Sequence, residues 1–124
     1  AQAHKLLDDN IQGMKGIVVG AGDMGVLAAK HLLRVGCDVV LVGRDLEKVE
    51  AVANTLGENV KADSMENLPK YLNRYRLLFS ATSAPEPVIT REMIENETLQ
   101  RYWFDMAIPR DIEEIALEKL RLFR

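Results

Sequence analysis

The sequence predicts a single-domain α/β fold built on a doubly wound, mostly parallel sheet. Two observations lead to this prediction. Short apolar runs alternate along the chain with segments in which apolar residues recur at helical spacing. The apolar runs are continuous rather than interleaved with polar residues, which is typical of strands buried on both faces of a parallel sheet. The length of 124 residues fits one domain of this kind.

The individual elements follow from these patterns. We expect strands at residues 17–19, 39–42, 77–79 and 102–104, a weaker strand around residue 60 and an edge strand at 120–123. We expect helices at residues 24–35, 46–56, 68–72, 90–94 and 112–119, preceded by a short leading helix within 3–12. Gly36 and Gly57 follow helices that glycine can end, while Asp45, Thr90 and Asp111 precede helices that they can cap. Residues 1–15 are thus assigned to a leading helix and 16–124 to the sheet domain.

Composition and charge exclude several classes of protein. The net charge is −3, and lysine and arginine do not gather into one block, so the sequence does not predict a strongly basic nucleic-acid surface. A single cysteine allows neither an internal disulfide nor a cysteine metal cluster, and we expect no metal site. No apolar run is long enough for a membrane helix, and the first residues lack a signal-peptide core. We therefore expect a soluble, cytoplasmic protein.

A glycine-rich run directly follows the first predicted strand. The residues Gly20-Ala21-Gly22-Asp23-Met24-Gly25 fit G-x-G-x-x-G, which holds a dinucleotide pyrophosphate when it joins a strand to a helix. Gly20 permits the tight turn, Gly22 lets the pyrophosphate approach the backbone, and Gly25 lets the helix pack closely. We expect the Asp23 side chain to point away from the pyrophosphate or to cap the helix. These features predict a Rossmann-type fold; the alternative is a structural glycine turn without a ligand.

The end of the second strand indicates which dinucleotide is bound. NAD-binding domains usually place an acidic residue there for the ribose 2′-hydroxyl, but this chain has Gly43 followed by Arg44. A small residue leaves room for a 2′-phosphate, Arg44 can pair with it in bidentate fashion, and Lys48 adds a second positive charge. The pattern favours NADP(H) over NAD(H). The alternative is that Arg44 is a solvated surface residue, and the neighbouring Asp45 adds negative charge.

Two more segments, together with the glycine turn, resemble one family. They are residues 80–90, SATSAPEPVIT, and residues 105–112, DMAIPRDI. All three are similar to segments of glutamyl-tRNA reductase, and the resemblance covers residues 16–123. It implies an NADPH-dependent oxidoreductase that reduces the glutamyl ester of tRNA(Glu) to glutamate-1-semialdehyde for tetrapyrrole (porphyrin) biosynthesis.

The resemblance also implies roles for particular residues. The glycine turn holds the pyrophosphate, and Arg44 holds the 2′-phosphate. The residues implied to line the rest of the cofactor are Ser80, Ala81 and Thr82 after the fourth strand, and Ala107, Ile108 and Pro109 near the nicotinamide. The chain departs from the family where Gly43-Arg44-Asp45 replaces the common Asn-Arg-Thr, which removes one hydroxyl contact to the phosphate. Asp23 likewise stands where the family more often has Glu.

Other parts of the enzyme are implied to lie outside these residues. In the family a separate N-terminal domain carries the nucleophilic cysteine, and a long C-terminal helix forms the dimer. We therefore expect the full-length protein to be a homodimer that holds glutamyl-tRNA through those domains. The isolated chain is expected to be a monomer that binds NADPH without turning over a substrate, because none of its residues has the setting of a covalent catalyst. Cys37 is predicted to be a small buried hydrophobe, and His4 and His31 to be surface residues.

Three other interpretations stay open at this point. A cofactor domain of a shikimate-dehydrogenase-like reductase shares the glycine turn, the arginine and the Ala-Thr-Ser loop, although residues 105–112 argue against it. A regulatory NAD(H)-sensing module would favour an acidic residue where Gly43 stands. A precorrin-2 dehydrogenase domain lacks a match to the last two segments.

Overall fold

A computed structural model describes residues 14–84, 86–95 and 99–105 of the chain. The predicted leading helix, the predicted helix at 112–119 and the predicted strand at 120–123 lie outside these residues. Within them, no helix is both long and apolar enough to cross a membrane.

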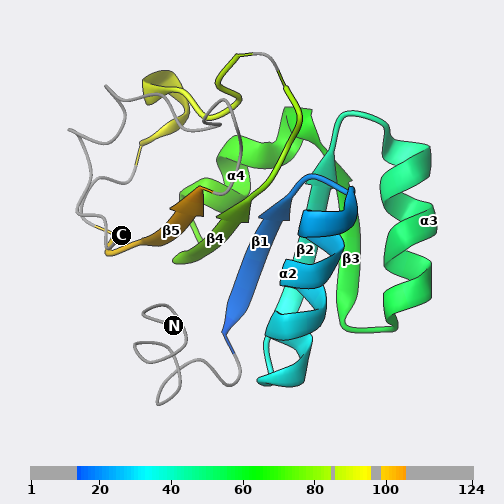
Figure 1. Cartoon of the computed structure of the whole chain (residues 1–124). Helices are drawn as coiled ribbons and strands as arrows, with labels where there is room; N and C mark the ends of the chain where they lie inside the picture. The colour runs from blue at the N-terminus through cyan, green and yellow to red at the C-terminus, as the bar shows by residue number, and fades with distance from the viewer. Residues whose placement is uncertain (1–13, 85, 96–98, 106–124) are drawn as a thin grey trace.

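A five-stranded parallel sheet forms the centre of the molecule, in the order β3-β2-β1-β4-β5 (Figure 1). Its strands are β1 (Lys15–Val19), β2 (Asp38–Gly43), β3 (Val60–Ser64), β4 (Leu77–Ser80) and β5 (Tyr102–Asp105). Every neighbouring pair runs parallel. The order of the strands reverses between β1 and β4, so the carboxyl ends of these two strands lie at a topological switch point. The predicted doubly wound α/β sheet is confirmed, including the weak strand at Val60.

Helices cover both faces of the sheet. Two helices, α2 (Asp23–Arg34) and α3 (Leu46–Leu56), pack on one face, and the short α4 (Leu68–Leu72) packs on the other (Figure 1). Successive strand side chains divide between the two layers because the strand period is two residues. In β1, for example, Val18 joins the core beneath α2, whereas Ile17 and Val19 join the core beneath α4. The continuous apolar strands of the sequence are explained by this double burial.

The predicted helix at 90–94 is wrong, because the structure has only a short 3-10 turn there, η2 (Arg91–Met93). Thr90 stands at the N-cap position but its side chain makes no capping bond. The side-chain amide of Asn73 donates to the Met93 carbonyl at 2.8 Å, and its oxygen accepts the Glu95 N–H at 2.8 Å. Backbone groups that would extend a helix are thus bound by Asn73, and the backbone is already extended at Ile94.

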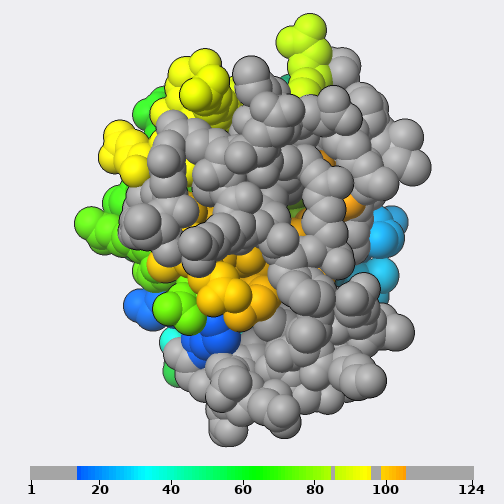
Figure 2. Space-filling view, turned by 90° about the vertical axis from the view of Figure 1, so that its left-hand side faces the viewer, coloured from blue at the N-terminus to red at the C-terminus, as the bar shows by residue number. Residues whose placement is uncertain are grey.

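Strand β5 forms one edge of the sheet, and its residues reach the surface in the side view of Figure 2 (orange). Trp103 is buried in the core beneath α4, whereas Tyr102 and Phe104 are half-buried on the other face. The ring of Phe104 packs on Phe79 of β4 with centroids 4.9 Å apart. The edge strand is therefore fixed to β4 by side-chain packing on both faces.

A buried arginine joins the start of β5 to the end of α4. Arg101 is fully buried, and its Nε donates to the Leu72 carbonyl at 3.1 Å while Nη1 donates to the Leu99 carbonyl at 3.1 Å. Nη2 donates to the Asn73 side-chain oxygen at 3.2 Å, and the guanidinium lies 5.7 Å from the Trp103 ring centroid. Burial lowers the pKa of this guanidinium, and the carbonyl contacts satisfy its N–H groups in the interior.

The thiol of Cys37 is expected to react very slowly in the folded protein. Burial first, and then the charge of Asp38, raises the pKa of Cys37 from 9.0 to about 11. Because only the thiolate reacts, a shift from 9.0 to about 11 lowers the reactive fraction at pH 8 roughly a hundredfold. Modification by a disulfide reagent, followed with and without urea, checks this. Equal rates in both conditions would show that the thiol is exposed.

Candidate dinucleotide-binding site

The turn after β1 has a backbone that only glycine adopts easily. Gly20 has φ +110°, and a Cβ placed on it would lie 2.7 Å from the Ala81 carbonyl oxygen. Its N–H donates to the Val42 carbonyl of β2 at 2.8 Å. This bond and the close approach of Ala81 fix the turn between β2 on one side and the end of β4 on the other.

The other two glycines of the run differ in how closely they are packed. A Cβ on Gly25 would overlap the carbonyl oxygen of Gly20, so α2 could not begin this close to β1 with any larger residue. A Cβ on Gly22 would meet no atom within 4 Å, so space is open at that residue. Gly22 is the N-cap of α2 and provides no side-chain cap, and Asp23 is exposed in the first turn. The first N–H groups of α2 therefore receive no side-chain cap from Gly22, and such groups at a helix N-terminus can bind an anion.

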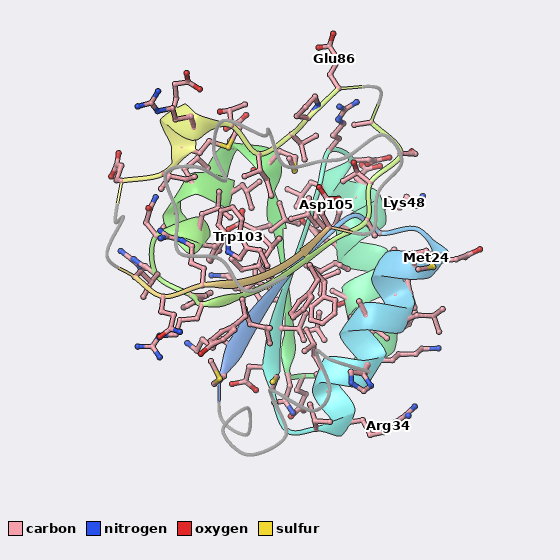
Figure 3. The ribbon with its side chains drawn as sticks, turned by 60° about the vertical axis from the view of Figure 1, so that its left-hand side comes forward. Met24, Arg34, Lys48, Glu86, Trp103 and Asp105 are labelled. Atoms are coloured by element: carbon pink, nitrogen blue, oxygen red, sulfur yellow. The ribbon has the colours of Figure 1, made fainter. Side chains whose placement is uncertain are left out.

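A cavity of about 440 Å³ opens where β1, β2 and β4 end. It is lined by the glycine turn, the start of α3 and the loop after β4; the lining residues are Gly20, Ala21, Gly22, Asp23, Met24, Gly43, Arg44, Asp45, Lys48, Val49, Met65, Ala81, Thr82, Ser83, Ala84 and Val88. Figure 3 shows Met24, Lys48 and Glu86 at this end of the molecule, with Arg34 at the far end of α2. The carboxyl edge of a parallel sheet is where ligands bind in open α/β folds.

The positive charge of the cavity comes from the residue after β2 and from the first turn of α3. Arg44 and Lys48 both line it and are exposed. Asp45 is the N-cap of α3, and its Oδ1 accepts the Lys48 N–H at 3.3 Å. A Cβ on Gly43 would lie 2.6 Å from Cγ2 of Val49, so the small residue is needed to pack α3 as well as to leave space in the cavity.

The loop after β4 forms the opposite wall. The N–H of Ala81 donates to the Val19 carbonyl at 2.9 Å and extends the pairing of β4 with β1 by one bond. Thr82 turns the chain by accepting the Ala84 N–H on Oγ1 at 3.2 Å. Both Ala81 and Thr82 are half-buried and face the cavity. Ser80 is fully buried at the end of β4, where it pairs with Val19, and it does not line the cavity.

The structure thus brings most of the predicted site together. Of the predicted residues, Gly25 and Ser80 do not line the cavity, and Ala107, Ile108 and Pro109 lie outside the described residues. Sequence reasoning did not predict the lining residues Asp45, Val49, Met65, Ser83, Ala84 and Val88. Met65 could have been found from its place just after the third strand, since ligands gather at strand ends. Among the described residues no group of three or more His, Cys, Asp or Glu could hold a metal ion.

Replacing Asp45 by asparagine is expected to tighten NADPH binding about threefold and to leave NADH binding unchanged. Asparagine caps a helix as well as aspartate does, so α3 keeps its start. The change removes a negative charge beside Arg44, and such a charge opposes a 2′-phosphate by about 0.5–1 kcal/mol across a solvated distance. Titration of both variants with both cofactors checks this. Equal tightening for NADH would refute the electrostatic explanation.

The sheet order and the glycine turn at its switch point define a dinucleotide-binding domain of the Rossmann type. A family model described as shikimate / quinate 5-dehydrogenase matches residues 1–124, and the chain belongs to this family. Among curated proteins, a glutamyl-tRNA reductase of Sulfurovum sp. is 83% identical over 124 residues, which are 100% of this chain and 28% of that protein. The chain thus spans a little over a quarter of this relative's length.

Solved structures agree with the fold and with the resemblance. Glutamyl-tRNA reductase from Methanopyrus kandleri matches 98% of this chain and 33% of its own, with a TM-score of 0.80 and 29% identity. A dipicolinate synthase from Bacillus halodurans matches 99% of this chain and 42% of its own, with a TM-score of 0.81 but 17% identity, so it shows the shared fold alone. The predicted resemblance to glutamyl-tRNA reductase is confirmed by the sequence identities.

Proposed function

We propose that this chain is the NADPH-binding domain of an enzyme that reduces glutamyl-tRNA to glutamate-1-semialdehyde in tetrapyrrole biosynthesis. The observation that carries the proposal is the 83% identity to a glutamyl-tRNA reductase over the whole chain, which includes every residue of the cavity. The family model alone would fit a shikimate or quinate dehydrogenase equally well. The similarity to these relatives therefore favours the reductase over a dehydrogenase of shikimate or quinate.

The residues that line the cavity support NADPH as its ligand. The open space at Gly22 and the start of α2 suit the pyrophosphate, and Arg44 with Lys48 suits the 2′-phosphate. The loop at Ala81 and Thr82 would lie along the cofactor toward the nicotinamide. When bound, the cofactor supplies the hydride, and the domain binds it, orients it and excludes water from it. Ala107 and Pro109 remain proposed contacts near the nicotinamide.

The remaining chemistry is assigned to other parts of the full-length protein. The described residues contain no exposed thiol, because Cys37 is buried and its pKa is raised. A covalent step on the glutamyl ester therefore needs a nucleophile from elsewhere, and we propose that glutamyl-tRNA is held there as well. The full-length protein is proposed to be a cytoplasmic homodimer, and this chain alone a monomer that binds cofactor.

A chimera tests this proposal directly. Residues 1–124 replace the matching segment of the Sulfurovum reductase, which aligns without loss at either end of this chain. The chimera is expected to form semialdehyde from glutamyl-tRNA and NADPH, and to leave shikimate with NADP⁺ unchanged. The isolated chain is expected to bind NADPH and form no product. An inactive but folded chimera, or turnover by the chain alone, would contradict the proposal.

A further inference from the structure

Hydrogen bonds centred on Asp63 join β3 to α4, next in the chain to the cavity residue Met65, and we call the group of Asp63, Ser64, Asn67 and Tyr71 the knot. The carboxylate of Asp63 accepts three side-chain or backbone donors. Ser64 donates its N–H to Oδ1 at 2.8 Å, Asn67 donates its side-chain amide to Oδ1 at 2.7 Å, and the hydroxyl of Tyr71 donates to Oδ2. The bonds reach across the 3-10 turn η1 (Met65–Asn67) and into α4. One side chain thus fixes both ends of the turn that contains Met65.

The surroundings of Asp63 and Tyr71 favour the protonation states in which the two side chains hydrogen-bond. Burial raises the pKa of Asp63, but the bonds from Tyr71, Asn67 and Ser64, together with the charge of Lys70, outweigh it and lower that pKa below its usual value. Burial, and then the bond to Asp63, raises the pKa of Tyr71 to about 12. At neutral pH the carboxylate is therefore ionised and the phenol protonated, which is the strong pairing of acceptor and donor.

The strand register places this knot near Arg44, the proposed contact of the 2′-phosphate and therefore of the adenosine half of NADPH. Ser64 pairs with Gly43 across β3 and β2, so the residues that follow each strand leave the sheet side by side. On β2 the next residue is Arg44, and on β3 it is Met65, and both line the cavity. Met65 also packs against the core beneath α4, where the ring of Tyr71 is buried. Met65 therefore belongs to the turn that Asp63 fixes, and its side chain packs on the same core cluster as the Tyr71 ring.

We propose that Asp63 and Tyr71 are positioning residues that set the cavity wall at Met65, and that this wall packs on the adenosine half of the cofactor. The inference rests on the proposed NADPH function and adds two residues that touch no cofactor themselves. A rigid apolar wall beside Arg44 lowers the entropy lost when the adenosine half binds, because the side chain and turn are already ordered. Removing a hydrogen bond of the knot is therefore expected to weaken the binding of the adenosine half of the cofactor.

Two matched variants on α4 and just after it test the proposal. Tyr71→Phe removes the bond to Asp63 and keeps the buried ring. Asn73→Ala is the control, because its hydrogen bonds, to Pro69, Met93, Glu95 and Arg101, all lie at a place that does not line the cavity. Affinities for 2′,5′-ADP and NADPH are measured by calorimetry well below each variant's unfolding temperature. The ¹³C-methyl signals of Met65 and Met93 report on the two places separately, after assignment with Met65→Leu.

Tyr71→Phe is expected to shift the Met65 signal and to weaken both ligands about threefold to tenfold, as loss of one charge-assisted bond allows. Asn73→Ala is expected to shift the Met93 signal and leave both affinities unchanged. Unchanged affinity in Tyr71→Phe, or equal weakening in both variants, would overturn the inference while leaving the proposed function intact. Failure of the unmodified chain to bind either ligand would instead refute the proposed function, and this inference would fall with it.

Discussion

Gly25→Ala is expected to abolish measurable NADPH binding and to lower the free energy of unfolding by about 3 kcal/mol or more. The added Cβ would overlap the carbonyl oxygen of Gly20, which is backbone and cannot rotate away as a side chain can. Relief requires α2 to move away from β1, and that movement breaks the turn that would hold the pyrophosphate. Urea unfolding and calorimetric titration of the same preparation measure both effects.

Gly22→Ala provides the matched control for this prediction. Gly22 has φ −81°, which alanine adopts readily, and a Cβ there meets no atom within 4 Å. We therefore expect normal stability but weaker NADPH binding, because the methyl group occupies space at the phosphate turn. A Gly25→Ala protein as stable as the unmodified chain would show that the turn can rearrange, and would contradict the close packing of α2 as the reason for the glycine.

Arg44→Ala is expected to weaken NADPH binding about tenfold to a hundredfold and to change NADH binding little. A guanidinium bound to a phosphate is a charge-assisted, bidentate contact worth about 1.5–3 kcal/mol, and Arg44 is exposed, which places the effect toward the lower value. NADH lacks the 2′-phosphate, so it loses no such contact. Titration with both cofactors separates a phosphate contact from a general loss of affinity.

Arg34→Ala is the control for charge alone. Arg34 is also exposed and ends the same helix that begins at the cavity, but Figure 3 shows it at the far end of α2. Its removal changes the net charge of the chain by the same amount. Equal weakening of NADPH binding in the two variants would mean that Arg44 acts only through long-range attraction and not by direct contact.

Local patterns were enough to predict the regular part of the fold. Strands β1, β2 and β4 form at the predicted apolar runs, because buried strands need apolar residues. Helices α2 and α3 end before Gly36 and Gly57, because a positive φ favours glycine there. The interval at residues 90–94 was predicted wrongly for the opposite reason. Its backbone groups are bound by Asn73, about twenty residues earlier in the chain, and no local pattern records such a partner.

The part of the candidate site that belongs to sequence motifs could be predicted. The glycine turn and Arg44 are read from spacing, and the structure places them on one cavity. Ser80 illustrates the limit, because a residue at a strand end faces either the ligand or the core, and here it is fully buried. Met65 follows a predicted strand end and could have been expected there, whereas Val88 lines the cavity from within the loop after β4, which no local pattern indicates.

Selection of NADPH through its 2′-phosphate is the property on which the proposed role of this domain depends. Calorimetric titration of the unmodified chain with NADPH and, separately, with NADH tests it most directly. We predict that NADPH binds at least about ten times more tightly, as one charge-assisted phosphate contact requires. Equal affinities, or tighter binding of NADH, would contradict this selection and would favour an NAD(H)-sensing module built on the same fold.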